Sequence, residues 1–221
     1  MLLGAGDPDP VRSLNAGGAS PFLLTADHAG NLIPQGLAAL GLPEAELPRH
    51  IAWDIGVAGL GETLSRALDA PFLSQRYSRL VIDCNRDPAS AEAAPGVSDG
   101  TVIPGNAHIS EAQLAARIAC VHRPYHDAIG AVIAARRARR LPTILVALHS
   151  FTPVLAGTAR PWEIGIMHGA GRAQFARLLC ADLAARSAMT VGDNLPYAMD
   201  ATDYSVAFHA FPNELPYVQI E

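Results

Sequence analysis

The chain has 221 residues, of which 50% are hydrophobic and 17% are charged. This composition is typical of one folded domain with a buried core, and it excludes a disordered chain or a coiled coil. The formal net charge is -5, so the surface repels nucleic acid on average. Charges and prolines interrupt every apolar stretch before the ~20 residues that a membrane span requires. We therefore predict a soluble protein without a nucleic-acid or membrane partner.

The cysteines and the N-terminus indicate an intracellular protein. Cys84, Cys120 and Cys180 are widely spaced and form no CxxC pair, which predicts reduced thiols in the cytoplasm. Residues 1–20 are rich in Gly, Asp, Ser and Pro and lack the basic and apolar regions of a secretory signal. We predict a flexible leader over residues 1–20 and a single domain over residues 21–221.

Short apolar runs alternate with stretches of helical periodicity along the chain. Strands are predicted at residues 22–26, 80–82, 143–148, 162–167 and 217–221, and helices at 54–68, 110–140 and 174–186. A capping box of Ser110 and Gln113 opens the second helix, and Pro124 is expected to kink or split it. Residues 87–110 hold many Gly and Pro residues and predict a long surface loop. The alternation predicts an α/β domain with a mixed sheet covered on both faces.

Two histidines follow the two most strand-like segments of the chain. His28 comes after residues 22–26, and His149 comes after residues 143–148. If these strands are neighbours, both imidazoles reach the same edge of the sheet, where α/β proteins place ligand chemistry. The alternative is that each histidine only caps a strand or binds a loop carbonyl.

Asp54 stands at the start of a predicted helix, where a carboxylate stabilises the helix dipole by roughly 0.3–1 kcal/mol. The same position can also direct a carboxylate at a metal held by strand-end imidazoles. A catalytic zinc takes three N or O ligands and keeps one position for water. His28, Asp54 and His149 would supply such a set.

The segment 77–86 places Arg79 and Arg86 at the two ends of a predicted strand. Both could be ordinary surface charges. However, Asp83 and Asn85 alternate with apolar residues directly before Arg86. Such clustering suits a site in which a guanidinium and an amide bind a substrate carboxylate.

Other candidates have weaker patterns. His122 and His126 are four residues apart and form a rival metal pair, although helix packing explains them as well. Ser150 follows His149 but lies outside a GxSxG motif, and the chain contains no GxGxxG or P-loop motif for a nucleotide.

Several of these motifs together resemble one enzyme family. They occupy residues 27–34, 53–56, 78–86, 148–153, 192–197 and 218–221. In this order they resemble the N-formylglutamate amidohydrolase (deformylase) family, from about residue 22 to the last residue. The resemblance implies a distant relation to the zinc carboxypeptidases and aspartoacylases, and with it a three-layer α/β/α fold and a metal-activated water.

The resemblance also implies which residues bind the metal. His28 and His149 would be ligands of zinc or of another divalent ion. In the carboxypeptidase-like group a carboxylate ligand stands three residues after the first histidine, where this chain has Asn31. We expect Asp54 to take that role. The alternative is Asn31 as a weak ligand or as a hydrogen-bond donor to His28.

The substrate contacts implied by the resemblance lie in three of the motifs. Asn85 and Arg86 match the element that holds the substrate α-carboxylate in the related enzymes. Arg79 lies near the position of an arginine that faces the developing oxyanion. Asn194 and Tyr197, in the motif at 192–197, are expected to contact the substrate as well.

Glu221 matches the glutamate of the family's C-terminal motif and would be the general base. It would take a proton from the metal-activated water and pass it to the leaving amine. The family continues past this motif, so we expect the native chain to extend beyond Glu221. The implied activity is hydrolysis of an N-acyl amino acid, with N-formylglutamate as the leading substrate.

Two further hypotheses stay open at this point. Asn31 in place of a carboxylate favours a metal-free module that only binds a carboxylate through Arg86. A serine hydrolase that uses Ser150 or Ser78 is the other alternative.

Overall fold

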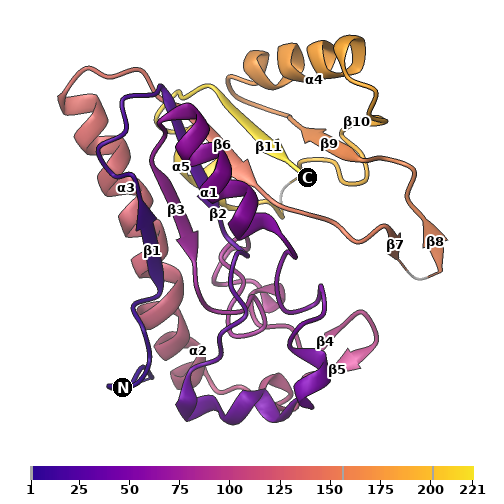
Figure 1. Ribbon diagram of the computed structural model, residues 1–221. Helices are drawn as coiled ribbons and strands as arrows, with labels where there is room; N and C mark the ends of the chain where they lie inside the picture. Colours follow the sequence, from indigo (N-terminus) through magenta and orange to yellow (C-terminus); the bar gives the residue numbers. More distant parts are fainter. Residues whose placement is uncertain (1, 156, 201) are drawn as a thin grey trace.

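The computed structural model describes residues 2–155, 157–200 and 202–221. Its centre is a seven-stranded sheet in the order β1-β3-β2-β6-β11-β9-β10 (Figure 1). The strands of this sheet are β1 (Val11–Leu14), β2 (Phe22–Ala26), β3 (Phe72–Gln75), β6 (Ile144–Leu148), β9 (Ile164–Met167), β10 (Val191–Asp193) and β11 (Tyr217–Ile220). Two hairpins lie outside it, formed by β4 (Val97–Ser98) with β5 (Thr101–Val102) and by β7 (Val154–Leu155) with β8 (Thr158–Ala159).

The helices are α1 (Val57–Leu68), α2 (Glu111–Arg117), α3 (Arg123–Ala138), α4 (Gln174–Arg186) and α5 (Ser205–Ala210). Short 3₁₀ helices occupy Gln35–Gly41, Glu44–Glu46, Ala91–Ala93 and Pro104–Asn106. A π-helical turn, Ile118–His122, joins α2 to α3. Within the described ranges, no helix combines the length and the apolar character needed to cross a membrane.

The order of the strands creates a crevice at one edge of the sheet. Strands β3, β2, β6 and β11 are parallel, β9 and β10 run the opposite way, and β1 is an antiparallel edge strand. From β2 the chain continues to β3 on one side, whereas β6 lies on the other side of β2. Connections that leave in opposite directions separate at the carboxyl ends of the two strands, and ligands bind there in α/β proteins.

Helices cover both faces of the sheet and form the predicted three-layer architecture (Figure 1). On one face, α3 and α5 bury Tyr125, Ile129 and Val206 against the strands. On the other face, α1 and α4 bury Val57 and Ala176. The prediction of an α/β domain with a mixed sheet covered on both faces is therefore confirmed.

Two local predictions differ from the structure. Residues 80–82 form a buried turn instead of a strand, because their apolar side chains pack into a separate core cluster beside the sheet. The third strand along the chain lies earlier, at β3. Residues 11–14 of the predicted flexible leader form β1, which pairs with β3 at the edge of the sheet. A short apolar run buries equally well in a turn and in a strand, so periodicity alone does not separate them.

The predicted helix over residues 110–140 is split as expected, but not at the proline itself. The Ser110–Gln113 capping box opens α2. The hydrogen-bonding pattern of the helix then changes to the π-helical turn, and α3 begins at Arg123 with Pro124 in its first turn. In the first turn of a helix the missing N–H of proline costs no hydrogen bond.

Candidate active site

The candidate site lies where β2 and β6 end side by side. His28 follows β2 and His149 follows β6, as predicted from the two strand-like segments. The two strands are paired directly, and the imidazole centroids are 5.0 Å apart. Both side chains are buried. They therefore form one site and do not cap separate strands.

The turn after β2 is held in place by close backbone packing. A Cβ atom at Gly30 would lie 2.0 Å from the carbonyl oxygen of Arg76, so only glycine fits there. The N–H of Leu32 donates to the same carbonyl at 3.2 Å. This packing fixes the backbone that carries His28.

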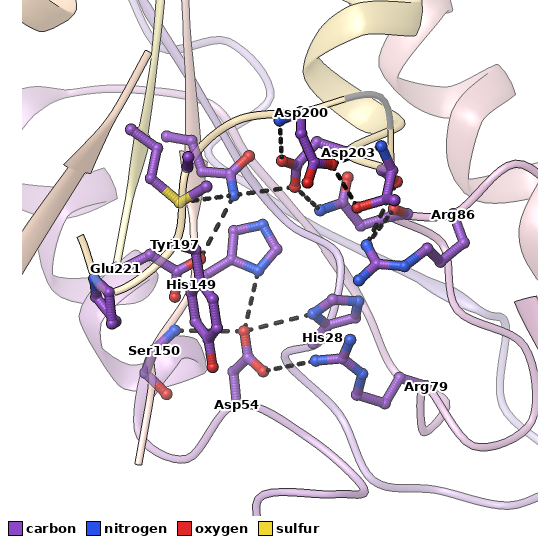
Figure 2. Close-up of a pocket in the computed structure, with 16 residues that line it drawn as sticks. His28, Asp54, Arg79, Arg86, His149, Ser150, Tyr197, Asp200, Asp203 and Glu221 are labelled. Atoms are coloured by element: carbon purple, nitrogen blue, oxygen red, sulfur yellow. Dashed lines mark hydrogen bonds and ion pairs between the residues drawn. The ribbon is translucent and has the colours of Figure 1, made fainter. Parts of the chain in front are cut away.

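Asp54 is carried back to this point by the loop before α1. Its N–H donates to the carbonyl of His28 at 2.9 Å. Its Oδ2 lies 3.0 Å from Nδ1 of His149 and 3.4 Å from Nδ1 of His28 (Figure 2). Helix α1 begins later, at Val57, and has no side-chain cap. The structural alternative for Asp54, a helix cap, is therefore wrong.

His28, Asp54 and His149 form a group that could hold a metal ion. One ligand atom from each lies within 4.8 Å of the others, and all three residues are buried. Two imidazole nitrogens and one carboxylate oxygen are donors that suit a divalent ion such as zinc. Nδ1 of His28 is buried without a hydrogen-bond partner among the described residues, so a cation would satisfy it.

Asn31, the alternative ligand, is not part of this group. Its amide Nδ2 donates to the carbonyl of Leu47 at 3.2 Å. The structure thus brings Asp54 to the two histidines in place of Asn31.

Buried carboxylates and an arginine surround the group. Nε2 of His28 lies 2.7 Å from Oδ1 of Asp83. Arg79 donates to the other oxygen of Asp83 at 2.7 Å and lies 3.5 Å from Oδ1 of Asp54. Arg79 therefore bridges the two acids and neutralises part of their buried charge.

The pKa values in the site reflect burial and these charges. Burial opposes protonation of His149, but Asp54 and Glu221 outweigh it and raise the pKa of His149 to about 10. Burial also works against ionisation of Asp54, yet His28 and His149 hold the pKa of its carboxyl far below the usual range. The carboxylates of the site therefore attract positive charge, either a proton or a metal ion.

Glu221 follows β11, the neighbour of β6 in the sheet. Backbone hydrogen bonds of 2.8 and 2.9 Å tie it to Gly165. Burial, reinforced by Asp54 and partly offset by His149, raises the pKa of the Glu221 carboxyl to about 7. A carboxylate with this pKa can accept and return a proton near neutral pH.

A cavity of about 410 Å³ opens over the group. Nearly all the predicted site residues line it, namely His28, Asp54, Arg79, Asn85, Arg86, His149, Tyr197 and Glu221. The opposite wall comes from residues 196–200 and 202–203, which carry Tyr197, Asp200 and Asp203 (Figure 2). The cavity therefore brings together side chains from both ends of the chain.

Asn85 and Arg86 lie side by side on the cavity wall. The amide of Asn85 donates to Asp203 at 3.0 Å and accepts from the N–H groups of Tyr204 and Ser205. Arg86 donates from Nη1 to backbone carbonyls, and its Nε lies 3.3 Å from Glu92. Asn85 thus fixes the opposite loop, whereas Arg86 presents a guanidinium to the cavity.

Asn194 and Tyr197 differ in their positions. Tyr197 lines the cavity, and its ring stacks on the guanidinium of Arg160 at 4.8 Å. Asn194 lies outside the lining that the structure describes. Its Oδ1 accepts a hydrogen bond from the N–H of His168 at 2.8 Å. This contact supports the loop and leaves Asn194 away from the substrate space.

The rival histidines and serines have structural partners. The rings of His122 and His126 are tilted to each other with centroids 4.4 Å apart, and they face the backbone carbonyls of Arg86 and Cys84. The hydroxyls of Ser78 and Ser150 donate to the carbonyls of Ala52 and Ile55. These contacts favour packing for the histidines and give neither serine a catalytic base.

The sequence did not point to several residues of the site. Met167, Pro196, Ala198, Asp200, Thr202, Asp203 and Gln219 also line the cavity. Gln219 could have been found from its place on the last strand, two residues before Glu221 and therefore on the same face. The loop residues give no such signal, because their position depends on how residues 196–200 and 202–203 fold over the sheet.

The comparisons with known proteins agree with this site. The sequence model of the family described as N-formylglutamate amidohydrolase matches residues 20–221. No curated protein matches the chain. Among solved structures, the gene product Atu2144 from Agrobacterium tumefaciens is 38% identical with a TM-score of 0.93, over 100% of this chain and 87% of that one.

A second solved structure is titled N-formylglutamate amidohydrolase, from Ralstonia eutropha JMP134. It is 22% identical with a TM-score of 0.67, over 97% of this chain and 85% of that one, and it shows a similar fold. The family match covers nearly the whole chain and includes every residue of the candidate site. The chain therefore belongs to the N-formylglutamate amidohydrolase family.

Proposed function

We propose that this protein hydrolyses the amide of an N-acyl amino acid, with N-formylglutamate as the leading substrate. The proposed cofactor is a divalent metal, with zinc as the first candidate. The observation that carries the proposal is the convergence of His28, Asp54 and His149 beneath a cavity that also holds Glu221 and Arg86.

His28, Asp54 and His149 would hold the metal. When bound, the ion supplies Lewis acidity that lowers the pKa of a water and polarises the amide carbonyl. Zinc suits this donor set, although N and O ligands discriminate weakly between divalent ions.

Glu221 moves the protons in this proposal. Its carboxylate takes a proton from the attacking water and later returns it to the leaving amine. The pKa of about 7 gives Glu221 both protonation states at neutral pH, which this double role requires.

The two cavity arginines have separate tasks. Arg79, held by Asp54 and Asp83, faces the oxyanion that develops as the amide carbonyl is attacked. Arg86 binds the substrate carboxylate, since a guanidinium forms paired hydrogen bonds with such a group. Tyr197 closes the cavity beside them.

The setting we propose is the reducing cytoplasm. Cys84, Cys120 and Cys180 are all free thiols in the structure. Free cysteines persist in a reducing compartment.

The test is release of formate from N-formylglutamate by protein of known metal content, with N-acetylglutamate as a second substrate. Turnover should disappear on chelation and return with zinc. The variant His149→Ala should lose activity, whereas His108→Ala, a change at an exposed histidine outside the cavity lining, should keep it. Ligand binding that survives chelation without any turnover would instead support the metal-free binding module. Loss of activity to a serine-directed reagent would support the serine hydrolase.

A further inference from the structure

Asp27 is a buried acid without an evident partner. It directly precedes His28, and its residue surface is 1% exposed. Neither carboxylate oxygen has a hydrogen-bond partner among the described residues. Buried carboxylates are rare in folded proteins unless they have a polar partner. A specific role for Asp27 would explain its burial.

The polar group that Asp27 faces is the far side of His149. Oδ2 of Asp27 lies 3.6 Å from Nε2 of His149. That nitrogen is also buried and has no hydrogen-bond partner in the described part of the chain. The other nitrogen, Nδ1, lies 3.0 Å from Asp54. Two carboxylates therefore stand at opposite nitrogens of one imidazole.

His28 has the same arrangement. Its Nδ1 faces Asp54 at 3.4 Å, and its Nε2 faces Asp83 at 2.7 Å. Both histidines thus direct Nδ1 toward the metal-binding group and Nε2 toward a buried acid. In metal sites such an acid accepts the ring N–H, fixes the tautomer and orients the ligand.

The other polar neighbours of Asp27 do not supply a positive charge. Burial, the charge of Asp27 and a polar contact with its carboxylate raise the pKa of the Tyr125 hydroxyl, so this group stays neutral. Burial lowers the pKa of His209 to about 4, although Asp27 acts in the opposite direction. The Nε2–H of His149 is the neighbour that links Asp27 to the metal-binding group.

We propose that Asp27 is a positioning residue of the metal site. It accepts the Nε2–H of His149 and thereby makes Nδ1 the nitrogen that binds the ion. Asp83 and Asp27 act as a pair, one behind each imidazole. The inference rests on the metal-dependent function proposed above, and it adds a residue that does not itself contact the ion or the substrate.

The first test compares the affinity for Zn²⁺ of wild type, Asp27→Asn and Tyr125→Phe, by competition with a chromogenic chelator. We expect Asp27→Asn to bind zinc about 10–100-fold more weakly. Tyr125→Phe, which changes a neighbour of Asp27 but keeps the acceptor, should bind within about threefold of wild type. The change also removes one member of a close buried pair, so the metal-free Asp27→Asn protein should melt at a lower temperature than wild type. A merely structural role would produce only this lower melting temperature and leave the zinc affinity unchanged.

The second test needs no variant. Two-bond ¹H–¹⁵N correlation spectra of the zinc-loaded protein, labelled at histidine, distinguish Nδ1 from Nε2 coordination. We expect His149 to bind zinc through Nδ1 and to carry a slowly exchanging proton on Nε2. Coordination through Nε2 would overturn the proposal, even if Asp27→Asn did not fold.

The outcomes also separate this inference from the proposed function. Wild-type protein that binds no metal would contradict both. Wild-type protein that binds zinc through His149, with an Asp27→Asn variant of equal affinity, would contradict only the role of Asp27.

Discussion

The carboxylate of Asp54 lies 3.0 Å from Nδ1 of His149, a residue 95 positions later in the chain. The contact exists because β2 and β6 are paired and the loop after β2 returns to their carboxyl ends. The same oxygen lies 3.4 Å from Nδ1 of His28. Three side chains that are distant in sequence therefore act as one unit.

Loss of Asp54 should release the metal. We expect Asp54→Ala to weaken Zn²⁺ binding by more than about 100-fold, because even loss of an acid behind a ligand weakens such sites 10–100-fold. Asp182→Ala, which removes an exposed acid on α4, is the matched control. Equal zinc affinity of Asp54→Ala and the control in a chelator competition would show that Asp54 is not a ligand.

Glu221 should control the acid limb of the pH profile. A general base must be unprotonated, so kcat/KM should fall as the pH drops below about 7, the pKa of Glu221. Glu221→Gln should lower kcat by roughly 10²–10⁴-fold, remove this limb and leave KM within a few-fold. A variant that keeps the wild-type pH profile would assign the limb to another group.

Zinc binding should release protons. The pKa of His149 is about 10 in the metal-free protein, so at pH 7 the ion must displace a proton from the imidazole. The affinity should therefore rise with pH, by up to about tenfold per unit, until about pH 10. Calorimetry in buffers of different ionisation enthalpy measures the protons released. A value of zero at pH 7 would contradict this account.

Protonation of His149 also makes the stability of the metal-free fold depend on pH. A folded-state pKa of His149 above its ordinary value of 6.5 stabilises the metal-free fold. This contribution is complete below pH 6.5 and is lost as the pH rises through 10. The melting temperature of the metal-free His149→Ala variant should lack this part of the pH dependence.

Arg86 should determine substrate affinity. Hydrogen bonds to charged groups contribute about 1.5–3 kcal/mol, so Arg86→Ala should raise KM by roughly 10–100-fold. The zinc affinity should not change. Arg66→Ala, at an exposed arginine of α1, is the control and should keep the wild-type KM. An unchanged KM in Arg86→Ala would place the carboxylate elsewhere in the cavity.

Gly30 should be essential for the turn that carries His28. A Cβ there would lie 2.0 Å from the carbonyl oxygen of Arg76, and such overpacking costs about 1–3 kcal/mol. Gly130→Ala is the matched control, since no atom lies within 4 Å of its added Cβ and the position is inside α3. That change should stabilise the protein by about 0.5–1 kcal/mol. Chemical denaturation of both variants gives the two values, and equal stabilities would contradict the packing argument.

Much of the fold could be predicted because the central strands are continuous apolar runs. β2 and β6 have such runs, β11 alternates like a strand, and α4 has a clear helical period. Strand β3 contains Ser74 and Gln75, which are buried polar residues, so its pattern did not indicate a strand. The apolar residues 80–82 suggested one instead, although they belong to a core cluster outside the sheet.

The metal-binding group could be predicted from residue types and family motifs, but its supporting residues could not. The location of His28 and His149 directly after two strand-like segments predicted that their imidazoles meet. The family motif at 53–56 predicted Asp54 as the third ligand. The position of Asp27 behind His149 depends on the pairing of β2 with β6, which the sequence does not state. The start of the cavity loop depends on packing of Leu195 over Gly165 and Gly192, where a Cβ would lie 2.4 Å from the carbonyl oxygen of Leu195.

The most direct measurement is an anomalous difference map at the zinc edge, from crystals of protein prepared with equimolar zinc. The account predicts one strong peak bonded to Nδ1 of His28, the carboxylate of Asp54 and Nδ1 of His149, at about 2.0–2.2 Å. A map with these side chains ordered and no peak between them would contradict it.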